Sequence, residues 1–137
     1  MRPPGPRSGL RLGAAIASAL WLLAACAQAP IAPVGLLDVA ARPAEKSLLA
    51  GLKAYDDAQY EPAERLFKDA LATGLASPRD RAEAHKRLAF VHCAAGKVAE
   101  CETEFRRARE ADPAFVLDKA EAGHPVWGPV YRKVVPQ

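Results

Sequence analysis

The sequence predicts an all-α protein, built from two helical hairpins and a short C-terminal capping helix. From Pro43 onward, apolar and charged residues alternate with the spacing of amphipathic helices. No segment combines strand-like alternation with turn dipeptides. The segment from Ala63 also matches the segment from Cys101, an offset of 38 residues, so the helices form a repeat.

Residues 1–25 predict an export signal. The apolar run over 12–22 follows three arginines, Arg2, Arg7 and Arg11, and it has the length of a signal-peptide core. It is too short to cross a bilayer as a permanent helix. The segment is therefore expected to direct the chain out of the cytoplasm and to be removed.

The end of this signal resembles the lipobox of bacterial lipoproteins, Leu23-Ala24-Ala25-Cys26. The resemblance implies that Cys26 carries lipid and becomes the first residue of the mature chain, which acyl chains then hold on a membrane surface. Ala27 follows in place of an aspartate, which in such lipoproteins is typical of transfer to the outer membrane, facing the periplasm. The alternative is an ordinary signal peptide cut near residues 27–29, which leaves a soluble periplasmic protein.

Residues 26–42 predict a flexible, lipid-linked tether. Pro30 and Pro33 prevent regular pairing, and the segment shows no helical period. An extended chain of this kind reaches about 3 Å per residue, so it would hold the domain some tens of Å from the membrane.

Residues 43–113 predict two helical hairpins whose ends have physical causes. Ser77 offers a hydroxyl N-cap, Pro78 occupies the first helical position and Asp80 places an acid in the first turn. Gly96 ends the third helix and Asp112-Pro113 stops the fourth. The expected helices are Pro43–Ala58, Tyr60–Thr73, Pro78–Ala95 and Val98–Ala111.

Charge argues against nucleic acid as a partner. The whole chain has 19 Lys and Arg against 16 Asp and Glu, and residues 1–25 hold three arginines and no acid, so the mature chain has 16 of each. A neutral chain lacks the positive field that nucleic-acid binders use. Its length suits one small domain.

The two repeat copies resemble the tetratricopeptide repeat. "AERLFKDA" at 63–70 lies over "CETEFRRA" at 101–108, and the same offset carries Gly51 onto Ala89. Each second helix thus has a small residue, a Phe four positions later and an Ala three later, as in the A-x3-F part of that repeat. The repeat's Trp and Tyr positions are not matched, and extra residues are expected around 73–79. The resemblance implies helical hairpins that stack on one another, and an unrelated four-helix bundle would bury the same residues.

The C-terminal segment, residues 114–137, predicts a cap for the second hairpin, because two repeats leave an apolar end uncovered. The motif His124-Pro125-x-Trp127 is interpreted as a rigid turn that delivers Trp127 into the core, with a recognition surface as the alternative. Glycines and prolines break the segment into short turns. The apolar residues expected to supply bulk are Phe115, Val116, Leu117, Val126, Trp127, Val130, Tyr131 and Val134.

A lipidated chain with two such hairpins, a cysteine pair and this tail is similar to short accessory lipoproteins encoded among bacterial type VI secretion and related envelope genes. The resemblance implies a non-enzymatic adaptor or scaffold that binds another envelope or secretion-system protein. The alternative is a structural subunit that self-associates through its repeat ends. In tetratricopeptide arrays the first helix of each hairpin lines a groove, which here implies Glu45, Leu48, Leu52, Tyr55, Asp56, Glu83, Lys86 and Phe90.

The sequence gives little support for catalysis, a metal or a cofactor, and we expect none of them. The mature chain has only Ser47 and Ser77 as serines, has no asparagine, and lacks a glycine-rich phosphate loop. His85 and His92 are two helical turns apart and Cys93 is adjacent, but no C-x-x-C or H-E-x-x-H spacing is present. Charged runs such as "ECETEFRRARE" are interpreted as solvated faces with i,i+4 ion pairs.

Cys93 and Cys101 remain as an even pair after Cys26 is lipidated. They lie almost symmetrically about the turn at 96–97, so an antiparallel hairpin makes a disulfide geometrically possible in an oxidising compartment. The alternative is two packed thiols, because Cys101 also fills the small-residue position that Ala63 occupies in the first copy.

Overall fold

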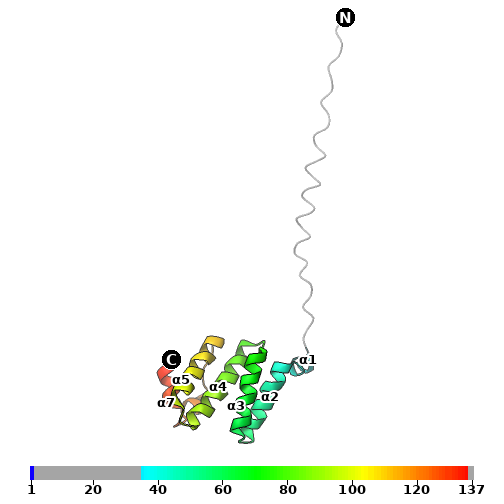
Figure 1. The fold of residues 1–137 in the computed structure, drawn as a ribbon. Helices are drawn as coiled ribbons and strands as arrows, with labels where there is room; N and C mark the ends of the chain where they lie inside the picture. Colours follow the sequence, from blue (N-terminus) through cyan, green and yellow to red (C-terminus); the bar gives the residue numbers. More distant parts are fainter. Residues whose placement is uncertain (2–34, 136–137) are drawn as a thin grey trace. The chain divides into compact units, whose positions relative to one another are not determined.

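The computed structural model describes residue 1 and residues 35–135. This part of the chain is all-α, as the sequence predicts, with no strand among residues 35–135. Figure 1 shows the helices lying side by side in chain order. They are α1 (Leu36–Ala40), α2 (Pro43–Asp56), α3 (Tyr60–Thr73), α4 (Pro78–Ala94), α5 (Val98–Ala111), α6 (Lys119–Ala122) and α7 (Gly128–Val134).

Two helical hairpins form the body of the domain. Helix α2 packs along α3, α4 packs along α5, and the hairpins meet where α3 contacts α4. Helices α3 and α5 have the predicted bounds. Helix α2 ends at Asp56, two residues before the predicted end, because Ala58 has a positive φ of 59° that a right-handed helix does not tolerate. Helix α4 ends one residue before its predicted end.

The residues predicted to begin and end the helices of the second hairpin do so, although α4 ends one residue early. The Ser77 hydroxyl accepts a hydrogen bond from the Asp80 N–H at 3.3 Å and so caps α4. Gly96 has φ +72° in the turn between α4 and α5, a conformation that costs glycine little. Helix α5 stops at Ala111, directly before Asp112-Pro113.

The repeated small–Phe–Ala pattern forms the core of each hairpin. Ala63, Phe67 and Ala70 on α3, and Cys101, Phe105 and Ala108 on α5, all have an exposed fraction of 0%. Gly51 on α2 lies so close to Phe67 that a Cβ built at Gly51 would be 2.8 Å from the Phe67 ring. The small residues therefore allow close helix approach, as the repeat predicts.

The C-terminal segment caps the second hairpin. Helix α7 packs on α5, and Phe115, Leu117, Tyr131 and Val135 join the core cluster around Phe105. The Tyr131 hydroxyl accepts a buried hydrogen bond from the Leu117 N–H at 3.2 Å. The prediction of a cap is therefore confirmed.

Two details of the cap differ from the prediction. Val116 and Val126 are 67% and 46% exposed instead of buried, because Val116 lies between buried Phe115 and Leu117 in an extended stretch and Val126 lies in a turn. The His124-Pro125 turn does deliver Trp127 against the core, where its ring stacks on Phe90.

The expected tether is wrong over its last part, because residues 36–40 form α1. The Gly35 N–H donates to the Asp38 carboxylate at 3.1 Å, and α1 packs on α2. A helix of five residues is too short to produce a periodic pattern. The signal segment and Cys26 lie outside the described residues.

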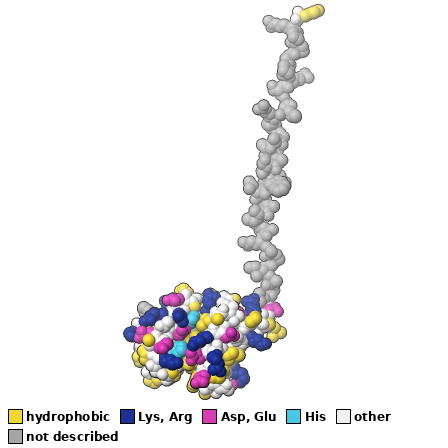
Figure 2. Space-filling view, viewed as in Figure 1, with side chains coloured by type: hydrophobic (Ala, Val, Ile, Leu, Met, Phe, Trp, Pro, Cys, Tyr) yellow, Lys and Arg dark blue, Asp and Glu magenta, His cyan; other side chains and the backbone are white. Residues whose placement is uncertain are grey.

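The surface of the domain carries both signs of charge without a dominant field. Figure 2 shows dark-blue and magenta side chains interspersed over the visible face of the helices. Within the described residues, none of the helices is both long and apolar enough to cross a membrane.

Candidate functional site

The predicted groove corresponds to a face made by α2 and α4, which we term the α2–α4 face. Its members are Leu52, Tyr55 and Asp56 of α2, and Glu83, Lys86 and Arg87 of α4. Asp56 is exposed and the other five side chains are partly buried. The Arg87 guanidinium lies over the Tyr55 ring, 5.0 Å from its centroid, and so joins the two helices. Five of these six residues were proposed for the groove from the sequence, and the contact with Tyr55 adds Arg87.

Three residues predicted for the groove belong to the interior instead. Leu48 and Phe90 are 5% and 2% exposed, because Leu48 packs in the first core cluster and Phe90 lies under Trp127. Glu45 is 5% exposed, and its carboxylate accepts a hydrogen bond from the Ala76 N–H at 3.4 Å in the connection between α3 and α4. The prediction of these three as surface contacts is wrong.

Lys86 is the electrostatic centre of the α2–α4 face. Its ammonium lies 2.9 Å from Glu83 and 2.8 Å from Glu121 of α6, so it ties the C-terminal segment to α4. Arg87 also pairs with Glu83 at 2.7 Å. Burial raises the pKa of the Glu83 carboxyl, but the hydrogen bonds and charges of Lys86 and Arg87 outweigh burial, so the pKa lies below its ordinary value.

A cavity of about 480 Å³ opens beside this ion-pair cluster. Four carboxylates line it against two cations, and Val116 is largely exposed at its edge. Such a lining suits a segment that carries basic and aliphatic side chains. Its residues are Arg79, Ala82, Glu83, Lys86, Asp112, Ala114, Phe115, Val116, Asp118 and Glu121.

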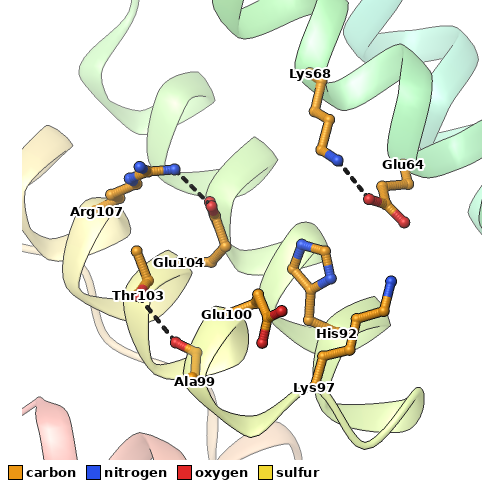
Figure 3. Close-up of a pocket in the computed structure, with 9 residues that line it drawn as sticks. All are labelled: Glu64, Lys68, His92, Lys97, Ala99, Glu100, Thr103, Glu104 and Arg107. Carbon is orange, nitrogen blue, oxygen red and sulfur yellow. Dashed lines mark hydrogen bonds and ion pairs between the residues drawn. The ribbon is translucent and has the colours of Figure 1, made fainter.

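A second groove of about 490 Å³ lies between α3 and α5, and we term it the α3–α5 groove (Figure 3). Figure 3 shows His92 between the α3 side chains Glu64 and Lys68 and the α5 side chains. The hydrogen bond from Lys68 lowers the pKa of Glu64, and the charges of His92 and Lys97 add to this against the opposite effect of burial. The lining residues are Glu64, Lys68, His92, Lys97, Ala99, Glu100, Thr103, Glu104 and Arg107.

The chemistry of the α3–α5 groove is that of a charged, mostly polar surface. His92 is 6% exposed and its Nδ1 has no hydrogen-bond partner among the described residues. Glu104 pairs with Arg107 at 2.8 Å and with His85 Nδ1 at 2.6 Å. With only Ala99 as an apolar side chain, the groove lacks the lining typical of small-molecule sites.

This groove was not predicted from the sequence, in which "ECETEFRRARE" has the pattern of a solvated face. Glu102 does form the expected i,i+4 pair with Arg106, at 3.0 Å. Glu104, however, is 7% exposed and reaches across to α4. A one-dimensional charge pattern cannot distinguish these two carboxylates, because only the neighbouring helix makes them different.

Cys93 and Cys101 form a disulfide with a Cα–Cα distance of 5.2 Å. The bonded alternative of the sequence argument is therefore confirmed. Because Cys93 has no free thiolate, the combination of His85, His92 and Cys93 is not available as a ligand set. Among residues 35–135 the structure places no three His, Cys, Asp or Glu side chains in a metal-binding group.

The described residues thus offer two surfaces, the α2–α4 face with its adjoining cavity and the α3–α5 groove. The first combines apolar, aromatic and charged side chains, and the second is almost wholly polar. No protein-family model matches the chain, and no curated protein or solved structure matches it either.

Proposed function

We propose that this chain is an envelope-anchored adaptor that binds a segment of another envelope protein on its α2–α4 face. In this proposal the chain carries a lipid on Cys26, followed by a tether and a tetratricopeptide-like domain with no catalytic role. The lipobox resemblance supports the anchor and its place on the periplasmic side of the outer membrane. The resemblance to accessory lipoproteins supports type VI secretion or envelope assembly as its setting.

One observation carries the proposal: α4 already holds a peptide segment of this same chain. The Trp127 indole stacks on Phe90 with 4.2 Å between ring centroids, and Glu121 pairs with Lys86 at 2.8 Å. An aromatic anchor flanked by an ion pair is a common way for a helical surface to hold an extended or short helical segment. The C-terminal segment thus illustrates the chemistry that this face offers.

The α2 half of the face is open to a partner. Leu52 and Tyr55 present partly buried apolar surface, Asp56 is exposed, and Tyr60 is 50% exposed with its ring 5.5 Å from that of Tyr55. Carboxylates dominate the adjoining cavity. We therefore propose a partner segment with an apolar anchor for Tyr55 and basic side chains toward Asp56 and the cavity.

Photo-crosslinking in the native envelope tests this proposal. A photoreactive amino acid at Asp56 is expected to capture a specific envelope protein, identified by mass spectrometry. The matched control carries the same amino acid at Glu61, an exposed residue at the start of α3, and is expected to give no such product. The charge reversal Asp56→Lys should reduce capture several-fold from a probe at Leu52, whereas Glu61→Lys should not.

Equal capture from Asp56 and Glu61, or a product insensitive to Asp56→Lys, would overturn the α2–α4 face as the binding surface. The anchor has a separate test. Cys26→Ser is expected to release the protein from sedimented membranes in detergent-free fractionation, and unchanged sedimentation would reject lipidation at Cys26.

A further inference from the structure

We propose that the N-terminal edge of the domain docks directly on an anionic lipid surface. The edge consists of Leu36 and Leu37 on α1, and of Arg42, Lys46 and Leu49 along the start and outer stripe of α2. The inference deepens the proposed function and rests on it for one step only, the distance from the membrane.

The apolar part of the edge is unusually exposed. Leu36 and Leu37 are each 83% exposed and Leu49 is 52% exposed. Helix α1 packs on α2, and α2 packs on α1 and α3. These three leucines are therefore left outside both core clusters of the described residues. Three large apolar side chains at one edge suit the boundary between lipid headgroups and acyl chains.

Cationic side chains stand beside these leucines. Arg42, Lys46 and Leu49 follow one another at intervals of four and three residues, which places them on one side of α2. Arg42 and Lys46 are exposed and have no ion-pair partner among residues 35–135. One turn further, Lys53 pairs with Asp57 at 2.8 Å, so the unpaired positive charge gathers at the end nearest α1.

Asp38 on α1 offsets only part of this charge, because it is one carboxylate against the two cations Arg42 and Lys46. Asp38 accepts the Gly35 N–H at 3.1 Å and so serves the start of α1. Figure 2 shows yellow and dark-blue surface, with some magenta, at the end of the domain that carries α1. Leucines beside unpaired Arg and Lys are the pattern of side chains that anionic headgroups attract.

A second copy of the chain fits this edge less well. A symmetric dimer through the outer stripe of α2 would bring Arg42 and Lys46 of one copy toward the same residues of the other. Exposed like charges that face each other oppose association. The charge of the edge therefore favours an anionic surface over a copy of itself.

The proposed anchor places the edge within reach of the membrane. Residues 27–35 separate Cys26 from Leu36, and at about 3 Å per residue for an extended chain they reach about 30 Å. A lipid on Cys26 would confine the edge to a thin layer above the headgroups, where even weak contacts become occupied through effective concentration.

The test couples the chain to vesicles in a defined way. In residues 26–137, made without lipid and with the disulfide intact, Cys26 is the one remaining thiol and reacts with a maleimide lipid. Vesicles of phosphatidylcholine alone are compared with vesicles of equal parts phosphatidylcholine and phosphatidylglycerol. Hydrogen exchange of the amides over 36–49 is expected to slow several-fold on the anionic vesicles only, and to return to its free rate in high salt.

Two pairs of variants separate the edge from general surface effects. The slowed hydrogen exchange should be lost in two double variants of the edge, Leu36→Ser with Leu37→Ser and Arg42→Glu with Lys46→Glu. The matched controls are Val98→Ser with Val116→Ser, and Arg65→Glu with Lys119→Glu, which change exposed residues elsewhere by the same chemistry and should leave it intact.

Three results would overturn the inference. The first is equal exchange on both vesicle types, and the second is an equal loss of protection in the edge and control variants. The third is a dimer in solution that the edge variants convert to monomer, which would make the edge an interface between copies. Because the coupling replaces the natural anchor and the partner is absent, none of these results bears on lipidation at Cys26 or on the α2–α4 face.

Discussion

The indole of Trp127 lies nearly flat on the ring of Phe90, with 4.2 Å between the ring centroids and 20° between the planes. The indole also stacks with the His124 ring at 3.4 Å, and its N–H donates to the Glu121 carbonyl at 2.9 Å. This single side chain therefore connects the turn after α6 to the inner side of α4. Trp127 covers part of Phe90, which the groove prediction treated as a surface residue and which also packs against Phe105.

Trp127→Ala is expected to lower the free energy of unfolding by about 2 kcal/mol. This loss is smaller than that for truncating a fully buried aromatic residue, because Trp127 is only half-buried. Trp127→Phe should lose less, since it keeps the stack and gives up the hydrogen bond. Urea unfolding followed by circular dichroism measures both. Val126→Ala, at an exposed neighbour, is the control, and an equal loss in that variant would reject the anchoring role of the indole.

The hairpins could be predicted from the sequence because their determinants are local. Small residues, Phe and Ala recur at fixed positions, and Ser77, Gly96 and Pro113 mark boundaries by their own backbone preferences. The burial of Phe90, which the groove prediction placed on the surface, could not be predicted in the same way. It depends on where the C-terminal segment lies, and no periodicity shows that Trp127 covers Phe90.

Gly51→Ala is expected to destabilise the first hairpin despite the higher helix propensity of alanine, which alone would add about 1 kcal/mol. The new Cβ would be 2.8 Å from two ring atoms of Phe67, a side chain with no exposed surface and therefore little room to move. Overpacking of this kind costs about 1–3 kcal/mol. Chemical denaturation of the purified domain measures the difference.

A second substitution shows whether this cost comes from the Phe67 contact. Phe67→Leu in the Gly51→Ala background should recover part of the loss, so the double-mutant cycle gives a favourable coupling energy. Ala50→Gly on the exposed side of α2 is the propensity control. Strictly additive effects of Gly51→Ala and Phe67→Leu would contradict the proposed clash.

Breaking the Cys93–Cys101 disulfide is expected to lower the free energy of unfolding by about 2–3 kcal/mol, because the bond closes a short loop and restricts the unfolded chain. For a domain of this size that loss lowers the Tm by several degrees. Reductant and Cys93→Ala/Cys101→Ala should have the same effect, measured in a Cys26→Ser background. Reductant should then leave the double variant unchanged, and two reactive thiols in the unreduced, unfolded chain would contradict the bond.

Two buried carboxylates could not be recognised from the sequence, because each binds a protein group instead of water. Glu45 and Glu104 look like ordinary surface acids in the sequence, yet Glu45 accepts from the Ala76 N–H and Glu104 pairs with His85. Both partners come from other helices or connections. Local charge patterns carry no information on such contacts, so only the packed structure distinguishes these carboxylates from Glu61 or Glu110.

Glu104 is expected to make stability depend on acid pH. Burial raises the pKa of its carboxyl, but the hydrogen bond from His85 and the charges of His85 and Arg107 outweigh burial and hold the pKa below its ordinary value of 4.5. A depressed folded-state pKa means that the stabilisation is complete above pH 4.5 and is lost as the pH falls through the folded-state value.

Glu104→Gln should therefore lower the free energy of unfolding by about 1–3 kcal/mol at neutral pH. The difference from the wild type should shrink below pH 4.5. Urea titrations across this pH range measure the difference in stability. Glu110→Gln, at an exposed residue on the same helix, is the control. If the stability advantage of the wild type stayed constant into strong acid, the ionised carboxylate would not be its source.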